Sequence, residues 1–299
     1  MILLFGGNGQ LGQEMTRASA ARAMPLVALS RAQADVTDRA AVGAAIKRHG
    51  SSLVVNAASY TKVDLAEIEI EATRQANEVG PAIVGAACAA AGVPLIHIST
   101  DYVFDGSKPG PYVEDDPIAP INSYGRSKAA GEQAVRETVP RHLIIRTSWI
   151  YGEFGQNFLK TMLQLAATRD ELRVVADQRG CPTSTPDLAG AILTIVPRML
   201  RDEKIRGTYH FAGSGVTTWH GFASRIVAAQ APLTGRTPRV TPITTAEFPT
   251  AARRPANSEL DCSRFEGVFG FRGRPWTTET DTITRTVVLA KLGKEPHVA

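Results

Sequence analysis

A short apolar run followed at once by a glycine-rich loop restricts most strongly what this chain can fold into. Residues 1–5 are uniformly hydrophobic, which is typical of a parallel strand covered on both faces. The loop 6–12 carries Gly6, Gly7, Gly9 and Gly12, and a helical stretch follows over about 10–21. Glycines at this spacing let the backbone approach a pyrophosphate, whose charge then lies at the helix N-terminus. An ordinary glycine-rich turn is the alternative, but the strand before and the helix after favour a dinucleotide site.

Strand and helix patterns alternate over the first half of the chain. Strands are expected at 25–29, 53–56, 93–99 and 142–146, and helices at 39–49 (capped by Asp38), 71–91 and 123–137. This alternation predicts the α/β class, with a Rossmann-type doubly wound parallel sheet.

The alternation ends after Thr147, which predicts a second, smaller unit. A helix at 187–200 and a strand at 207–211 are expected to return to the sheet, whereas 213–274 is rich in Pro, Thr and Arg and poor in long periodic segments. We therefore expect an NADP(H)-binding domain at 1–150 plus about 184–212. A C-terminal substrate-binding lobe is expected at about 151–183 and 213–275, and a C-terminal helix and tail at 276–299.

Composition excludes several classes of function. The chain has 43% hydrophobic and 21% charged residues and no apolar run long enough for a membrane span. Its net charge of +4 is carried by scattered Lys and Arg, so neither nucleic acid nor membrane is an expected partner. Three distant cysteines suit a reducing cytoplasm, and no His or Cys spacing suggests zinc. The oligomeric state stays open, with a homodimer as one option.

The end of the second strand predicts the cofactor. An NAD-selective site usually has an acidic residue there, bonded to the ribose 2′-hydroxyl. This chain has Ser30 and Arg31 instead. A hydroxyl and a guanidinium suit a 2′-phosphate, which favours NADPH and leaves NADH as the alternative.

Three residues form the expected catalytic group. Thr100 leaves the end of the fourth strand, where ligands of open α/β sheets collect. Tyr124 and Lys128 lie four residues apart on one helix face. A nearby cation is expected to lower the pKa of the phenol, which could then protonate a carbonyl oxygen while hydride reaches the carbonyl carbon.

With these elements assembled, the chain resembles the extended short-chain dehydrogenase/reductase superfamily, and more finely the dTDP-4-dehydrorhamnose reductase family. The resemblance implies hydride transfer from NADPH to C4 of dTDP-4-dehydro-β-L-rhamnose, giving dTDP-L-rhamnose. Tyr124 would give the proton, Lys128 would hold the nicotinamide ribose and Thr100 would orient the carbonyl. The matching segments are 6–12, 35–37, 56–58 with 63–64, 99–106, 124–128, 146–152, 177–183 and 254–258.

The same resemblance implies further ligand contacts. Tyr102 and Trp149 would face the sugar, although the aromatic residues near Trp149 could equally be core. Magnesium held by glutamates occurs in the family; Glu14 lies at a suitable place, but its partners cannot be identified, so a metal is left unknown. The residues expected to line the cofactor are Gly6, Gly9, Gln10, Leu11, Gly12, Ser30, Arg31, Asp35, Val36, Ala57, Ala58, Tyr124 and Lys128. Those expected to hold the thymidine diphosphate are Asp177, Gln178, Thr183 and Arg254.

Two other functions remain as alternatives. The first is an NAD-dependent nucleotide-sugar epimerase or dehydratase. Dehydratases of this superfamily place an Asp-Glu pair after the threonine, whereas this chain has Asp101 and Tyr102. The second is a non-catalytic regulatory subunit that binds a nucleotide, against which the presence of all three catalytic residues argues.

Overall fold

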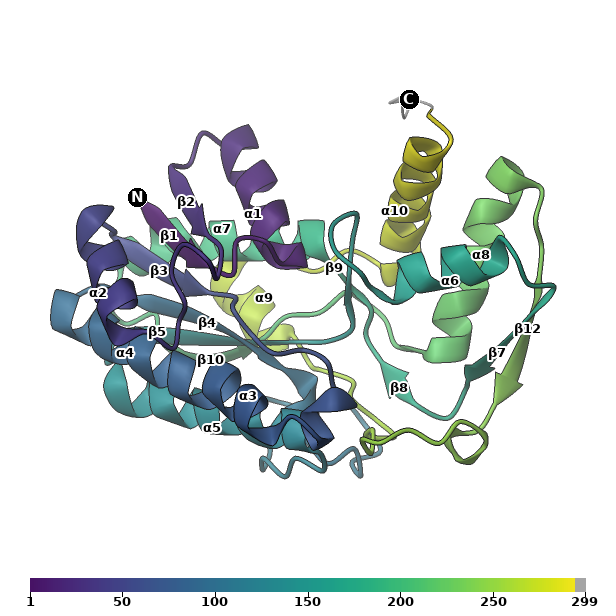
Figure 1. Ribbon diagram of the computed structural model, residues 1–299, viewed down its shortest axis with the longest axis horizontal. Helices are drawn as coiled ribbons and strands as arrows, with labels where there is room; N and C mark the ends of the chain where they lie inside the picture. Colours follow the sequence, from purple (N-terminus) through teal and green to yellow (C-terminus); the bar gives the residue numbers. More distant parts are fainter. Residues whose placement is uncertain (294–299) are drawn as a thin grey trace.

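A six-stranded parallel sheet organises the first lobe of the computed structural model, which describes residues 1–293 (Figure 1). Its strand order is β10-β5-β4-β3-β1-β2, and every neighbouring pair is parallel. The predicted doubly wound α/β class is confirmed. The strands are β1 (Ile2–Phe5), β2 (Leu26–Leu29), β3 (Leu53–Asn56), β4 (Leu95–Thr100), β5 (His142–Thr147) and β10 (Gly207–His210).

Helices cover both faces of this sheet, each with its own apolar core. On one face, Met15 and Phe265 belong to the same buried cluster as Leu4. On the other, Val84 packs with Leu3. The sheet strands are therefore buried on both sides, which explains their continuous hydrophobic sequences. The first face carries α1 (Gln10–Ala21), α7 (Thr185–Arg201) and α9 (Ser263–Phe269); the second carries α2 (Arg39–Arg48), α4 (Gly80–Ala91) and α5 (Ser123–Thr138).

The helix expected at 71–91 is not continuous, so that prediction was wrong in detail. Helix α3 (Ile70–Arg74) runs into a π-helical turn (Gln75–Val79) before α4 begins. Pro81 lies at the start of α4 and has no N–H to continue the ladder of the preceding turn. Gly92 ends α4 with a φ of 66°, as the sequence predicted.

The second lobe is built from short strand pairs and three helices. A separate cluster that includes Leu163, Val174, Phe222 and Val287 forms its core. The strand pairs are β6 (Ile150–Tyr151) with β9 (Thr183–Ser184), β7 (Glu171–Val175) with β12 (Arg239–Ile243) and β8 (Arg179–Gly180) with β11 (Thr217–Thr218); the helices are α6 (Phe158–Ala166), α8 (Trp219–Thr234) and α10 (Trp276–Lys291).

Two expectations for the C-terminal half need correction. The region 213–274 contains a long regular helix, α8. Helix α9, which was assigned to the substrate lobe, packs on the first lobe through Phe265 and Phe269. The predicted C-terminal helix is α10, which belongs to the core of the second lobe; the tail beyond 293 lies outside the described residues. Within residues 1–293, none of the helices combines the length and hydrophobicity that crossing a bilayer requires.

A buried ion pair fixes α5 against the sheet. Glu132 of α5 is 0% exposed and Arg146 of β5 is 1% exposed. Two hydrogen bonds join them, from Nε at 2.9 Å and from Nη2 at 2.8 Å. Ser99 of β4 (2.6 Å) and Arg136 (2.6 Å) also donate to the carboxylate, so each Glu132 oxygen has two partners. Because the bonds are directional, they set the rotation of α5 as well as its distance from the sheet.

We expect Arg146→Met to lower the free energy of unfolding by about 3 kcal/mol, because breaking a buried pair leaves a carboxylate without its main countercharge. Urea denaturation measures this. The matched control is Arg173→Met, which breaks the exposed pair with Glu247 and should change stability by no more than about 0.5 kcal/mol. Equal effects of the two substitutions would contradict this account of α5.

Candidate active site

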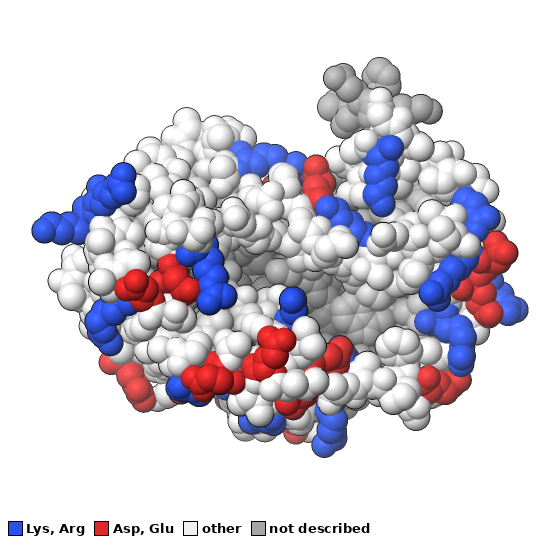
Figure 2. All heavy atoms as spheres, in the orientation of Figure 1, with Lys and Arg blue, Asp and Glu red and all other residues white. Residues whose placement is uncertain are grey.

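The C-terminal end of β4 and the N-terminal end of α5 bring the predicted catalytic residues together. Figure 2 shows a central hollow on this face of the molecule. Thr100 is the last residue of β4 and caps the 3₁₀ turn Asp101–Val103. Tyr124 lies in the first turn of α5. A hydrogen bond with Thr100 acts to lower the pKa of Tyr124, which identifies the two hydroxyls as neighbours.

The close approach of α5 to this turn depends on Gly125. A Cβ at this position would lie 2.1 Å from the carbonyl oxygen of Tyr102. The Asn122 side chain caps the helix there by accepting a hydrogen bond from the Gly125 N–H at 2.7 Å. The Tyr102 and Tyr124 rings meet edge to face with centroids 5.9 Å apart. The glycine inside the Tyr-Lys motif therefore has a structural reason that the sequence reasoning missed.

The electrostatics of the pair differ from the expectation. Burial raises the pKa of Tyr124 to about 12 and outweighs the Thr100 hydrogen bond, while Asp101 raises it further. Burial also lowers the pKa of Lys128 to about 8. The Lys128 ammonium donates to the Ile98 carbonyl oxygen at 2.6 Å. The predicted lowering of the tyrosine pKa is thus wrong for this structure, and Tyr124 keeps its proton at neutral pH.

Asp101 is a buried acid to which the sequence reasoning gave no role. It is 2% exposed, and burial raises its pKa to about 6. It accepts hydrogen bonds from the hydroxyls of Thr100 (2.9 Å) and Ser148 (3.0 Å). A threonine hydroxyl has one proton. That one proton can go to Asp101 or to Tyr124, and only its donation to Tyr124 lowers the pKa of the phenol.

The glycine loop has the shape that a dinucleotide pyrophosphate requires. A Cβ at Gly12 would lie 2.3 Å from the Gly6 carbonyl oxygen, and Gly6 has a φ of +92° next to Ala57 and Ala58. Gly9 is the N-cap of α1, and among residues 1–293 no side chain caps the N–H groups of the first turn, which includes Gln10 and Leu11. These residues fit the cofactor.

At the second strand, the predicted ribose-phosphate residues lie at the surface. The Arg31 side chain is 86% exposed and pairs with Asp35 at 2.8 Å. The Ser30 hydroxyl donates to Gln33 at 2.8 Å, and Val36 is buried. An exposed guanidinium held by one carboxylate remains accessible to a phosphate.

The predicted diphosphate residues separate into two groups. Arg254 lies beside Tyr102 and forms hydrogen bonds to Asp64 at 2.7 and 3.0 Å. Asp177 and Gln178 instead contact Thr245, at 2.6 and 3.0 Å between side chains.

Thr183 is fully buried, with its hydroxyl donating to the Cys181 carbonyl oxygen at 3.1 Å and accepting from the Gly213 N–H at 3.2 Å. Its role in substrate binding stays a prediction against which this burial argues.

Trp149 has an unusual conformation. Its φ of 47° lies in the left-handed region, which a bulky residue rarely adopts. Its indole stacks on Trp219 with centroids 3.6 Å apart, and its buried Nε1 has no hydrogen-bond partner among residues 1–293. Strain of this kind is often found at ligand sites. A contact with the sugar stays a prediction.

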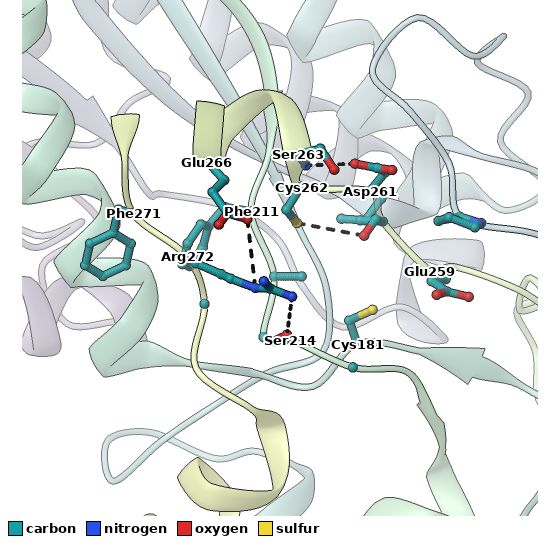
Figure 3. A pocket seen from close by; sticks show the side chains of 16 residues that line it. Cys181, Phe211, Ser214, Glu259, Asp261, Cys262, Ser263, Glu266, Phe271 and Arg272 are labelled. Atoms are coloured by element: carbon teal, nitrogen blue, oxygen red, sulfur yellow. Dashed lines mark hydrogen bonds and ion pairs between the residues drawn. The ribbon is translucent and has the colours of Figure 1, made fainter. Parts of the chain in front are cut away.

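A cavity of about 230 Å³ lies away from the predicted catalytic residues (Figure 3). Cys181, Cys262 and Arg272 line it, and Arg272 bonds to Ser214 at 3.4 Å. Burial raises the pKa of each of the two thiols to about 12, so neither is a thiolate nucleophile at neutral pH.

Glu14, the residue considered for magnesium, has a cationic partner. It is 2% exposed and accepts hydrogen bonds from Arg17, both Nη2 contacts being 2.9 Å. In the part of the chain that the structure describes, no three His, Cys, Asp or Glu side chains are grouped to hold a metal. The residues present therefore do not fit a metal centre, and no chemical step is assigned to one.

Comparisons with known proteins agree with this geometry. A family model described as the RmlD substrate binding domain matches residues 1–288. A dTDP-4-dehydrorhamnose reductase of Sinorhizobium fredii is 44% identical over 96% of this chain and 98% of its own length. A dTDP-4-dehydrorhamnose reductase structure from Clostridium acetobutylicum superposes with a TM-score of 0.87 at 36% identity, covering 94% of this chain and 97% of its own.

A structure of the Bacillus anthracis dTDP-4-dehydrorhamnose reductase in complex with NADP gives a TM-score of 0.86 at 35% identity, over 94% of this chain and 97% of that one. Since both the family model and these relatives extend over nearly the whole chain, the protein belongs to the RmlD substrate binding domain family.

Proposed function

We propose that this protein reduces the C4 ketone of dTDP-4-dehydro-β-L-rhamnose to dTDP-L-rhamnose with NADPH. The observation that supports the proposal most is the convergence of Thr100, Tyr124 and Lys128 at the carboxyl end of β4, on the same edge of the parallel sheet from which the glycine loop leaves β1. Relatives aligned over 92% and 96% of this chain are named for that reaction. A homodimer and a cytoplasmic location stay predictions.

The residues have distinct parts in this reaction. The glycine loop would hold NADPH, which would supply the hydride for C4. Tyr124 donates its proton to the carbonyl oxygen, and its raised pKa suits a group that must arrive protonated. Thr100, whose hydroxyl neighbours the phenol, would orient the substrate carbonyl. Lys128, anchored to the β4 backbone, would hold the nicotinamide ribose.

The direct test is oxidation of NADPH on addition of dTDP-4-dehydro-β-L-rhamnose, followed at 340 nm. One NADPH should be consumed for each substrate. A protein that carries bound NAD⁺ and interconverts sugar nucleotides without net oxidation would instead be an epimerase or dehydratase. NADPH binding without any turnover would favour the regulatory subunit.

Tyr124→Phe should lower kcat by a factor on the order of 10² or more, since it removes the proton donor and leaves the ring in place. NADPH affinity and the thermal midpoint should stay close to those of the wild type. The control is Tyr209→Phe, which removes a buried tyrosine hydroxyl of the first-lobe core, away from the site. A kcat that Tyr124→Phe leaves unchanged would rule out the tyrosine as the acid.

The kcat/KM for NADPH should fall as pH rises through about 8. Lys128 is charged below its pKa of about 8 and neutral above it, so its bond to the ribose weakens on the alkaline side. An ordinary lysine would stay charged to about pH 10. The measurement is a pH profile from 6 to about 10, the range in which Tyr124 stays protonated. A profile that is flat across this range would show that Lys128 titrates higher than its burial implies.

Arg31→Ala should raise KM for NADPH roughly tenfold and leave KM for NADH unchanged, because only NADPH carries the phosphate that this guanidinium can bind. The control is Arg48→Ala, which also removes one exposed arginine but at the C-terminal end of α2. If both cofactors lose affinity equally, Arg31 does not read the 2′-phosphate.

A further inference from the structure

A carboxylate of the first lobe holds the arginine assigned to the diphosphate. Asp64 precedes the 3₁₀ turn Leu65–Glu67, whereas Arg254 lies in the long connection before α9. The two side chains form a bidentate pair: Nη1 lies 3.0 Å from Oδ1 and Nη2 lies 2.7 Å from Oδ2. Oδ1 also accepts from the Ala252 N–H at 3.1 Å. One carboxylate therefore fixes both the side chain and the backbone of this connection.

Asp64 pairs with the two Nη groups and does not occupy the Nε edge of the guanidinium. Nη1 is fully engaged, because it also contacts the Thr250 hydroxyl (2.6 Å) and the Ala252 carbonyl oxygen (3.2 Å). Within residues 1–293, the Arg254 Nε–H forms no hydrogen bond. A guanidinium can bind an oxyanion through its Nε–Nη edge as well as through its two Nη groups. Asp64 uses the second mode and leaves the first available.

Arg254 lies close to the catalytic group. Burial acts to lower the pKa of Arg254, whereas hydrogen bonds with Asp64 and with the Tyr102 side chain raise it, so Tyr102 is a neighbour that a phosphate bound here would meet. The Tyr102 ring packs on Tyr124 with centroids 5.9 Å apart. A phosphate bound at this edge would place the attached sugar towards the proton donor. The Arg254 side chain is only 20% exposed, so its position is already restricted before a ligand arrives.

We propose that Asp64 is a positioning residue for the substrate diphosphate: it orients Arg254 so that the Nε edge receives the phosphate oxygens. The inference rests on the proposed function, since it takes a nucleoside diphosphate sugar as substrate.

Asp64 has two opposing effects on the binding of that ligand. It orders a flexible arginine in advance, which reduces the entropy lost on binding, and its charge repels the diphosphate. Because the Asp64 side chain is 44% exposed, water screens the repulsion, whereas the hydrogen bonds act directly; ordering is therefore the larger effect.

The test is Asp64→Asn, which keeps the size of the side chain and removes its charge. We expect KM for the sugar nucleotide and Kd for thymidine diphosphate to rise roughly tenfold, as for the loss of one charge-assisted contact. The values of kcat, Kd for NADPH and Kd for thymidine, which has no phosphate, should stay within about twofold. Asp64→Glu, which keeps the charge, should recover part of the affinity. Asp281→Asn is the control, because it breaks a comparable exposed pair with Arg225.

A double-mutant cycle with Arg254→Gln shows whether Asp64 acts through the arginine. In the Arg254→Gln background, Asp64→Asn should have no further effect on thymidine diphosphate binding. Unchanged or tighter binding by Asp64→Asn alone, or an equal loss in both backgrounds, would overturn the proposal. Thymidine diphosphate binding does not require turnover. A wild-type protein that binds thymidine diphosphate but fails to reduce the keto sugar would therefore count against the proposed reaction. The positioning role of Asp64 could still be measured by thymidine diphosphate binding.

Discussion

The rotation of α5 about its own axis is the constraint on which the site depends. Four side chains spaced four residues apart form a single stripe on this helix: Tyr124, Lys128, Glu132 and Arg136. The C-terminal half of the stripe is held by the buried Glu132–Arg146 pair and by Ser99 of β4. The N-terminal half, Tyr124 and Lys128, therefore faces the ends of β4 and β5. Apolar packing alone would tolerate a small rotation of the helix, whereas these bonds do not, because a buried carboxylate without its partners is costly.

Much of this arrangement could be predicted from local patterns. The bounds of α1 agree with the sequence, because an apolar strand, glycines and a helical stretch follow one another without ambiguity. Helix α8 was missed since Gly221 and Pro232 lie within it and its apolar residues do not form a clear stripe. The π-helical turn before α4 had a signal, Gly80-Pro81, that was not used. Pairings between distant segments, such as Asp64 with Arg254, have no sequence signature and needed the fold.

The protonation states show why residue types alone mispredicted the chemistry. From sequence, a lysine one turn from a tyrosine suggests a lowered phenol pKa. In the structure the same burial acts on both groups in opposite directions, since it disfavours whichever form is charged: the phenolate of Tyr124 and the ammonium of Lys128. A reductase needs its acid protonated before the hydride moves. Burial alone meets that need, and the hydrogen bond with Thr100 limits how far the pKa rises.

Contacts from distant segments hold residues assigned to both ligands. At the cofactor end, Asn157 donates to Gln10 at 3.0 Å and Arg17 pairs with Glu153 at 2.7 Å. At the substrate end, Asp64 holds Arg254. Neither contact is part of a core, so each adds little to stability. Their effect is on geometry, because each contact fixes the position of a residue assigned to a ligand. Gln10 and Arg254 would both have to be in place when C4 of the sugar meets the nicotinamide.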